Sequence, residues 1–302
     1  MSRLWKGIII FMKLIITMIQ GFCMALADSV PGVSGGTIAF IMGFYDKFIG
    51  SIHDIAFKKG EDRKNALYFL IKLGLGWIVG MALAALVLSS LFESHIYVVS
   101  SLFIGFIAGA VPLIVKEEKE SCKDVGKGIL FAILGIVFVV GLTWLNGRIE
   151  ATSDLAVFSV GLGVKLFFIG MFAISAMFLP GISGSTLLLV FGVYMPIMAA
   201  IKEILHFNLA YFPALFVFGL GIIFGALTVV KVIKVCLDKF RTQTVYMILG
   251  MMLGSFYAIV MGPTTLKNAM PAMRFDTFHI IACIAGLALV LGMQFVKSKG
   301  EN

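Results

Sequence analysis

A short stretch rich in proline, glycine and hydroxyl side chains occurs twice in the chain. Residues 31–45 read PGVSGGTIAFIMGFY, and residues 180–194 read PGISGSTLLLVFGVY, about 149 positions later. Proline ends a helix and glycine permits tight turns, so each copy predicts a helix break followed by a new helix beginning near Thr37 or Thr186, with threonine as its N-cap. A helix N-terminus carries unpaired N–H groups and a partial positive charge, which bind phosphate. The residue types therefore indicate an anion site.

The predicted anion site comprises the small and hydroxyl-bearing residues of both copies. Irregular backbone at membrane depth occurs only where it is buried in protein or lines a wet cavity. Two such loops facing each other near the bilayer midplane would hold one anionic headgroup. The alternative is a pair of tight turns whose small residues serve helix packing, and the symmetric second copy favours binding. The candidate residues are Pro31, Gly32, Ser34, Gly35, Gly36, Thr37, Pro180, Gly181, Ser183, Gly184, Ser185 and Thr186.

Five further residues are candidates for accessory roles. Asp28 precedes the first copy and can accept hydrogen bonds from loop N–H groups, bind a coupling cation or carry a proton. Lys72 and Lys165 lie inside predicted spans; each can reach a phosphate or extend to the membrane surface, and the second role is favoured. Tyr45 and Tyr194 end the two copies and either line the site or serve as packing and interfacial residues.

Enzymatic chemistry has one weak signal. Residues 32–36, GVSGG, match the G-x-S-x-G pattern of a serine nucleophile. The second copy breaks this pattern at Ser185, and a nucleophile needs no duplicate. The four histidines lie in predicted loops or near span ends, and the four cysteines have no zinc or disulfide spacing. The sequence therefore predicts a non-enzymatic protein without a cofactor or metal.

The composition defines the elements that must position these residues. Of 302 residues, 60% are hydrophobic and only 13% are charged, and the mean hydropathy is +1.06. A soluble protein of this length needs more charge, so we expect an all-α polytopic membrane protein. The N-terminal run resembles a signal peptide, but Lys13 interrupts it, so we predict a first span instead. Apolar runs occur at 4–27, 66–92, 96–115, 126–145, 157–179, 211–235, 243–262 and 278–297, with shorter runs at 37–52 and 186–201.

The similarity between the two copies extends beyond the opening motif. Residues 73–80 align with 218–225, and the glycines of the following span align at the same offset of 145. We therefore interpret the chain as two membrane repeats, 1–150 and 151–302. Each half contains five segments if the motif segment counts as one, and an odd number inverts the second half. Inverted repeats with matching broken or re-entrant helices are typical of transporters whose site lies between the halves.

The charge distribution agrees with a membrane protein rather than a nucleic-acid-binding one. The net charge is +8, but the basic residues cluster near the chain ends and in short loops at 58–64, 116–127 and 231–241. Cytoplasmic loops of membrane proteins carry such an excess, so both termini are predicted to be cytoplasmic. The loop 262–277, with Lys267 and Arg274, falls outside in this topology and fits less well.

Residues 27–37, ADSVPGVSGGT, and 179–186, LPGISGST, resemble the PopT family of polyprenyl-phosphate transporters, and the similarity spans essentially the whole chain. The resemblance implies a multi-pass protein of the bacterial cytoplasmic membrane. It implies a flippase that returns undecaprenyl phosphate, the lipid carrier of peptidoglycan and other envelope polymers, from the outer to the cytoplasmic leaflet. It also implies that the phosphate lies at 31–37 and 180–186. Met195 stands where the family often has an acidic residue, a departure that counts against a role for a charge there.

Two other functions compete with lipid transport. One is secondary transport of a small soluble anion through the same broken-helix site. The other is a membrane enzyme such as a lipid phosphatase or serine protease, against which the lack of an Arg/His cluster argues. A lateral opening between the repeats would favour the lipid, because only the headgroup is costly to move through hydrocarbon. A proton or sodium gradient can drive either transporter, with Asp28 as the candidate coupling acid; the oligomeric state is not indicated.

Overall fold

The computed structural model describes residues 3–28, 34–83, 89–145, 155–181, 184–265 and 270–300, and within these ranges all regular structure is helical. This agrees with the predicted all-α class. The helices are α1 (Arg3–Asp28), α2 (Gly35–Ile41), α3 (Tyr45–Phe57), α4 (Glu61–Leu83), α5 (Ser89–Glu117), α6 (Val125–Leu145), α7 (Val160–Phe178), α8 (Gly184–Val190), α9 (Tyr194–Leu205), η2 (Leu209–Tyr211), α10 (Phe212–Lys239), α11 (Arg241–Met261), η3 (Gly262–Thr265) and α12 (Ile280–Gly300).

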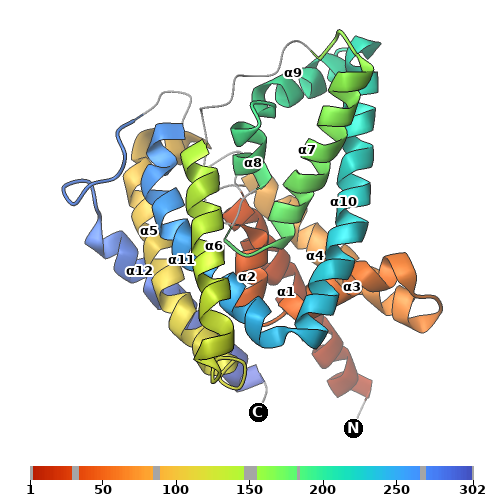
Figure 1. Cartoon of the computed structure of the whole chain (residues 1–302). Helices are drawn as coiled ribbons and strands as arrows, with labels where there is room; N and C mark the ends of the chain where they lie inside the picture. Colours follow the sequence, from red (N-terminus) through yellow and green to blue (C-terminus); the bar gives the residue numbers. More distant parts are fainter. Residues whose placement is uncertain are drawn as a thin grey trace.

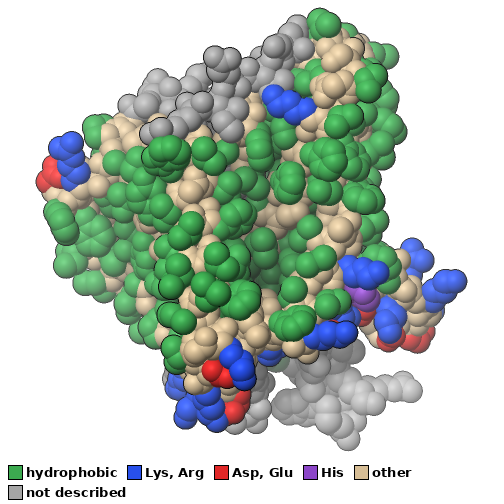
Figure 2. Space-filling model, in the orientation of Figure 1, with side chains coloured by type: hydrophobic (Ala, Val, Ile, Leu, Met, Phe, Trp, Pro, Cys, Tyr) green, Lys and Arg blue, Asp and Glu red, His purple; other side chains and the backbone are tan. Residues whose placement is uncertain are grey.

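Six helical stretches among the described residues are long and apolar enough to cross a membrane. Most charged side chains in view in Figure 2 lie toward the end where α1 begins and α12 ends, and hydrophobic side chains cover the middle. The chain is therefore a multi-pass membrane protein. The six stretches are Glu61–Leu83, His95–Glu117, Val125–Leu145, Val160–Phe178, Leu209–Lys239 and Arg241–Thr264, and shorter apolar stretches cover Leu14–Asp28 and Ile280–Gly292.

The helices pack in four main pairs, α1 with α4, α7 with α10, α5 with α12, and α6 with α11. Glycines at these contacts let the backbones approach closely, as in other membrane helix pairs. A Cβ on Gly76 of α4 would overlap Met18 of α1, and a Cβ on Gly221 of α10 would overlap Phe167 of α7. The α1–α4 and α7–α10 pairs thus use residues at matching positions of the two halves.

The other two pairs follow the same rule. A Cβ on Gly105 of α5 would overlap Cys283 of α12, and a Cβ on Gly250 of α11 would overlap Ala132 of α6. Here each pair joins one helix of the first half to one of the second. In all four pairs, therefore, glycines at corresponding positions of the two halves pack against corresponding helices.

Each motif lies between a long helix and two short ones. α1 and α7 enter from opposite ends of the molecule and stop near its middle, where α2 and α8 begin (Figure 1). The expected single helix after each motif is wrong, because Gly43 (φ 70°) and Gly192 (φ 67°) separate α2 from α3 and α8 from α9. These glycines adopt left-handed backbone that other residues rarely tolerate.

Two further expectations need correction. The first new helix begins at Gly35 with Ser34 as its N-cap, so Thr37 is not the cap; Ser34 is extended (φ −126°, ψ 153°), which lets its hydroxyl reach back to a backbone N–H of the first turn. The predicted span 66–92 is also displaced, since α4 ends at Leu83 and α5 already begins at Ser89, with a non-helical kink at His95.

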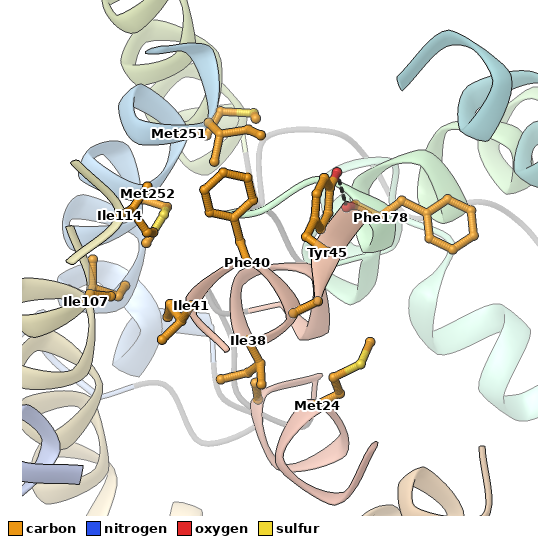
Figure 3. Packing of buried hydrophobic residues seen from close by; sticks show 14 of the residues in the cluster. Met24, Ile38, Phe40, Ile41, Tyr45, Ile107, Ile114, Phe178, Met251 and Met252 are labelled. Atoms are coloured by element: carbon orange, nitrogen blue, oxygen red, sulfur yellow. Dashed lines mark hydrogen bonds between the residues drawn. The ribbon is translucent and has the colours of Figure 1, made fainter. Parts of the chain in front are cut away.

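The helix α2 forms the centre of the core. All seven of its residues are buried. Figure 3 shows Phe40 directed toward Met251 of α11 and Ile41 toward Ile107 of α5. A short helix that is apolar on every side is stable only when protein surrounds it. The core therefore fixes the N-terminus of α2, and with it the first motif.

Candidate functional site

The two motifs meet through a chain of buried hydrogen bonds. The N–H of Gly181 donates to Thr37 Oγ1 (2.8 Å), and the Ser34 hydroxyl donates to the carbonyl of Leu179 (3.0 Å). Ser34 Oγ and Thr37 Oγ1 lie 3.2 Å apart, and because the Ser34 proton is used on Leu179, Thr37 donates in this pair. Ser34 is 0% exposed and Thr37 is 1% exposed. The structure thus brings the first motif's hydroxyls onto the second motif's backbone.

Close backbone approach explains two of the glycines. A Cβ on Gly36 would lie 2.7 Å from the carbonyl oxygen of Phe178, at the end of α7. Gly181 has a φ of +89°, and a Cβ there would lie 2.6 Å from the carbonyl carbon of Met251 in α11. The Tyr45 hydroxyl also donates to Phe178 O (3.0 Å; Figure 3). A side chain at Gly36 would therefore push the first motif away from the end of α7, and a side chain at Gly181 would push the second motif away from α11.

Asp28 is bound to the first motif. Its carboxylate accepts a hydrogen bond from the N–H of Gly35 (2.6 Å) and another from Nε1 of Trp77 in α4 (2.9 Å). This is the loop-binding role that the sequence allowed for Asp28, and it places a carboxyl group at the N-terminus of α2. Such a position is favourable for a negative charge. Cation or proton coupling through Asp28 stays a prediction.

The matching end of α8 has a different partner. A Cβ on Gly184 would lie 2.5 Å from Cγ of Met177, which occupies the position that matches Asp28. The position matching Trp77 is Ile222. The carboxylate and indole of the first half are therefore replaced by two apolar side chains in the second half.

Several predicted site residues are placed only partly. Pro180 is buried beside Gly181. Ser185 and Thr186 lie in the first turn of α8, and their side chains are outside what the structure describes. Pro31, Gly32 and Ser183 lie outside the described residues altogether.

The remaining accessory candidates do not join the motif contact. Lys72 is half-buried on α4, and Tyr194 is half-buried at the start of α9. Lys165 is exposed near the start of α7, roughly 20 Å along the helix from its end at Phe178 at about 1.5 Å per residue. Lys165 therefore lies far from the place where α7 meets the first motif.

The sequence analysis missed two residues that support the motifs. Trp77 binds Asp28 as described above. The hydroxyl of Ser255 in α11 lies 2.9 Å from the carbonyl oxygens of both Gly181 and Met251, and Ser255 is fully buried. A polar side chain inside an apolar span signals that it needs a partner, but nothing local indicates which partner it finds.

An ion-pair cluster lies beside the C-terminal end of α2, and it too was not predicted from the sequence. Arg241 at the start of α11 donates through Nη1 to Asp46 of α3 (3.0 Å) and through Nε to Glu118 (3.0 Å). Burial raises the pKa of the Glu118 carboxyl, but Arg241, with a hydrogen bond from Ser121, outweighs burial and holds that pKa below its ordinary value. The second half has Met195 at the position matching Asp46, so this cluster has no repeat-related acid there.

The described part of the site shows no arrangement for covalent or metal chemistry. The hydrogen-bond partners of the Ser34 hydroxyl are the Thr37 hydroxyl and N–H and the Leu179 carbonyl, none of which is a general base. Over the described residues there is no cluster of three or more His, Cys, Asp or Glu side chains that could hold a metal. What the motifs present is hydroxyl and backbone N–H groups, which suit an anion.

Fold and site together define a polytopic α-helical membrane protein in which two interrupted helices meet in the core. The chain belongs to the family described as "VCA0040-like: Undecaprenyl phosphate translocase-like", whose model matches residues 24–275. It is 35% identical over 250 residues to a polyprenyl-phosphate transporter of Staphylococcus aureus (strain NCTC 8325 / PS 47), covering 83% of this chain and 87% of that protein.

A second relative gives the same result. The chain is 31% identical over 323 residues to a polyprenyl-phosphate transporter of Vibrio cholerae serotype O1 (strain ATCC 39315 / El Tor Inaba N16961), covering 95% of this chain and 98% of that protein. No solved structure matches the chain. The resemblance found in the motifs is thus confirmed at the level of the family.

Proposed function

We propose that this protein transports polyprenyl phosphate, and that it returns undecaprenyl phosphate from the outer to the cytoplasmic leaflet for synthesis of cell-envelope polymers. The observation that carries this proposal is the direct bonding of Ser34 and Thr37 to Leu179 and Gly181 in a chain of this family. A phosphate at this contact would touch both halves of the protein. Movement of one half against the other would then change the side from which the headgroup is reached.

The helix contacts support an inverted repeat of residues 1–150 and 151–302 around this contact. Matching glycines pack on matching helices, and α1 and α7 enter from opposite ends of the molecule. α2 and α8 have seven residues each, or about 10 Å of helix, against a hydrocarbon core of about 30 Å. They are thus re-entrant elements in this proposal. The basic residues near the start of α1 and the end of α12 favour cytoplasmic termini in the bacterial inner membrane.

The phosphate binds, in this proposal, when the bonds between the motifs open. Opening would release the N–H of Gly181 and the hydroxyls of Ser34 and Thr37, which now bond to one another and to the carbonyl of Leu179. Ser183, Ser185 and Thr186 extend the set of donors from the second motif. A charged Asp28 at the N–H of Gly35 would oppose a phosphate there, and proton or sodium binding by Asp28 would relieve this repulsion.

Reconstitution in proteoliposomes tests the proposal against transport of a soluble anion. Labelled undecaprenyl phosphate is placed in one leaflet, and its arrival in the other leaflet is followed with and without imposed proton or sodium gradients. We expect protein-dependent exchange that excess inorganic phosphate does not suppress. Uptake of radiolabelled inorganic phosphate without lipid exchange would contradict the proposal and support the soluble-anion alternative. Protein-free vesicles give the background rate.

A further inference from the structure

An apolar cavity of about 840 Å³ lies between α1 and α12, one helix from each half. Ile16 and Ile19 line it from α1, Ala285 and Ala288 from α12, and Met42 from the end of α2. Small-molecule sites in proteins have volumes of about 300–1,000 Å³ and are mostly apolar. Ile16 and Ile19 are 48% and 50% exposed, so the cavity opens at the surface of the molecule. Its size and composition suit part of a hydrocarbon chain.

The cavity is formed by the helix faces that packing leaves uncovered. Positions 285, 288, 289 and 292 follow the spacing of one helix face and all line the cavity. The other face of α12 packs on α5, where a Cβ on Gly286 would overlap Leu102. On α1, Met18 and Gly21 face α4. Each helix thus holds the fold with one side and presents the other to the cavity.

The matching helix of the first half, α6, carries larger side chains at the corresponding positions. Gly135 of α6 meets Met247 as Gly286 of α12 meets Leu102, so α6 and α12 correspond at an offset of 151. In this alignment Leu134 and Val137 stand where α12 has Ala285 and Ala288. Both are exposed on α6. The cavity between α1 and α12 is therefore not a general property of a lipid-facing surface of this fold.

The cavity and the motif contact lie at opposite ends of α2. Met42 is the C-cap of α2, and Ser34, which bonds to the second motif, is its N-cap. α2 therefore links the motif to the cavity over roughly 12 Å at 1.5 Å per residue. Once the bonds between the motifs open, a ligand with its phosphate at the motif could place a long apolar tail in the cavity and from there in the bilayer.

We propose that the cavity between α1 and α12 binds the isoprenoid tail of the transported lipid beyond the units next to its phosphate, an inference that rests on the proposed function. The tail subsite makes the protein select a polyprenyl phosphate over a phosphate with a short tail. Ala285 and Ala288 set the width of the cavity, because their small side chains leave room for the tail beside α12.

A substitution that fills the cavity tests the proposal. Ala288→Phe places a ring in the cavity, and Val137→Phe places the same ring on the matching exposed face of α6. Both variants are compared with wild type in a leaflet-exchange assay with undecaprenyl phosphate and with farnesyl phosphate. We expect Ala288→Phe to slow exchange of undecaprenyl phosphate about tenfold at low substrate, as a filled apolar pocket does. Farnesyl phosphate should be little affected, and Val137→Phe should behave as wild type.

A photoreactive polyprenyl phosphate with a diazirine in its tail provides a second readout. We expect adducts on the α1 and α12 segments that line the cavity, lost in Ala288→Phe and competed by undecaprenyl phosphate but not by phosphatidylglycerol. Equal competition by phosphatidylglycerol, or unchanged exchange of undecaprenyl phosphate in Ala288→Phe, would overturn the tail subsite and leave the proposed function standing. A wild-type protein that exchanges no undecaprenyl phosphate would overturn both. Size-exclusion profiles and thermal unfolding check that the variants fold.

Discussion

The two copies of the motif have nearly the same sequence, but the residues that the structure describes in each copy contribute differently to the contact between them. The first copy contributes side chains, the hydroxyls of Ser34, Thr37 and Tyr45. The second contributes backbone, the groups of Phe178, Leu179 and Gly181 to which these hydroxyls bond. The comparison teaches that, over the described residues, matching positions of a repeated sequence can play different parts in one contact, with hydroxyls from one copy bonded to backbone groups of the other.

The surroundings of the two copies strengthen this difference. The first loop is bound by Asp28, which Trp77 holds in turn. The second loop has Met177 and Ile222 at the matching positions and is held by the first loop and by Ser255. An anion that enters between the copies therefore meets a carboxyl group on one side and none at the matching position on the other. In the proposed mechanism the second motif is the more favourable phosphate partner.

Replacing Gly181 should have the largest effect on the contact between the copies. Gly181→Ala places a Cβ against the backbone of Met251 in left-handed geometry. Overpacking of this kind costs about 1–3 kcal/mol, and the left-handed conformation adds about 1–2 kcal/mol. We expect a lower thermal-unfolding temperature in detergent and loss of lipid exchange.

Gly74→Ala is the matched control for that substitution, because a Cβ at Gly74 of α4 has open space around it. Alanine in a helix interior is about 0.5–1 kcal/mol better than glycine, so this variant should be at least as stable as wild type. If Gly181→Ala unfolded and transported like Gly74→Ala, the close approach of the second motif to α11 would be irrelevant.

Removing the carboxyl group should have the next largest effect and should be confined to the first copy. Asp28→Ala leaves the N–H of Gly35 and the indole of Trp77 without an acceptor, at about 1–3 kcal/mol for each buried group. Asp28→Asn removes the charge and keeps one acceptor oxygen, but its NH2 group faces the other donor, so it should lose less stability than Asp28→Ala but not match wild type. Unfolding and exchange rates of both variants measure this. Loss of ion-gradient dependence in Asp28→Asn would identify Asp28 as the coupling residue, and an unchanged dependence would exclude it.

Substitution of the tyrosines that end the two copies should change the stability by a smaller amount, and by different amounts at the two positions. Tyr45→Phe removes the bond to Phe178 O and should cost about 0.5–1.5 kcal/mol. Tyr194 is half-buried, and Tyr194→Phe should change the unfolding temperature less. A thermal-unfolding comparison of the two variants is sufficient. Equal destabilisation by the two substitutions would contradict the prediction that the Tyr45 hydroxyl contributes more to stability than the Tyr194 hydroxyl.

The smallest effect on stability is expected from the ion pairs of Arg241 with Glu118 and Asp46. Because the pKa of Glu118 is lowered in the folded protein, its pairing with Arg241 stabilises the fold above the ordinary pKa of a glutamate. This stabilisation is lost as the pH falls through the lowered pKa of Glu118. We expect the unfolding temperature to fall in acid by a smaller amount in Glu118→Gln than in wild type. An identical pH profile for both proteins would argue against the ion pair as a stabilising contact.

Local sequence was sufficient for most of the helices and for the breaks before the motifs, but not for the breaks at Gly43 and Gly192 or for the boundary between α4 and α5. Proline, glycine and apolar run length act within a few residues, so the spans and the interruptions at Asp28 and Phe178 could be predicted. The choice of Ser34 over Thr37 as the cap could not, because both residues can cap a helix and the tertiary contact with Leu179 distinguishes them. Trp77 lies 49 residues from Asp28, and nothing local to either residue indicates the pair.

The ion pairs of Arg241 lie even further apart in the chain. Its partners Glu118 and Asp46 are 123 and 195 residues away. Their contact depends on how α3, α5 and α11 pack, which apolar periodicity does not specify. The cavity between α1 and α12 depends on packing in the same way, since the small side chains of α12 define a cavity only when the facing helix is known.

The most direct test of the central claim is leaflet exchange of undecaprenyl phosphate in proteoliposomes with Ser34→Ala, Ser183→Ala and the double variant. If the phosphate is held by the paired motifs, each single variant should lose part of the exchange rate and the double variant more, while all three remain folded. Wild-type exchange in the double variant would contradict binding at the motifs. Complete loss in Ser34→Ala with none in Ser183→Ala would instead indicate a single essential serine and contradict a shared site.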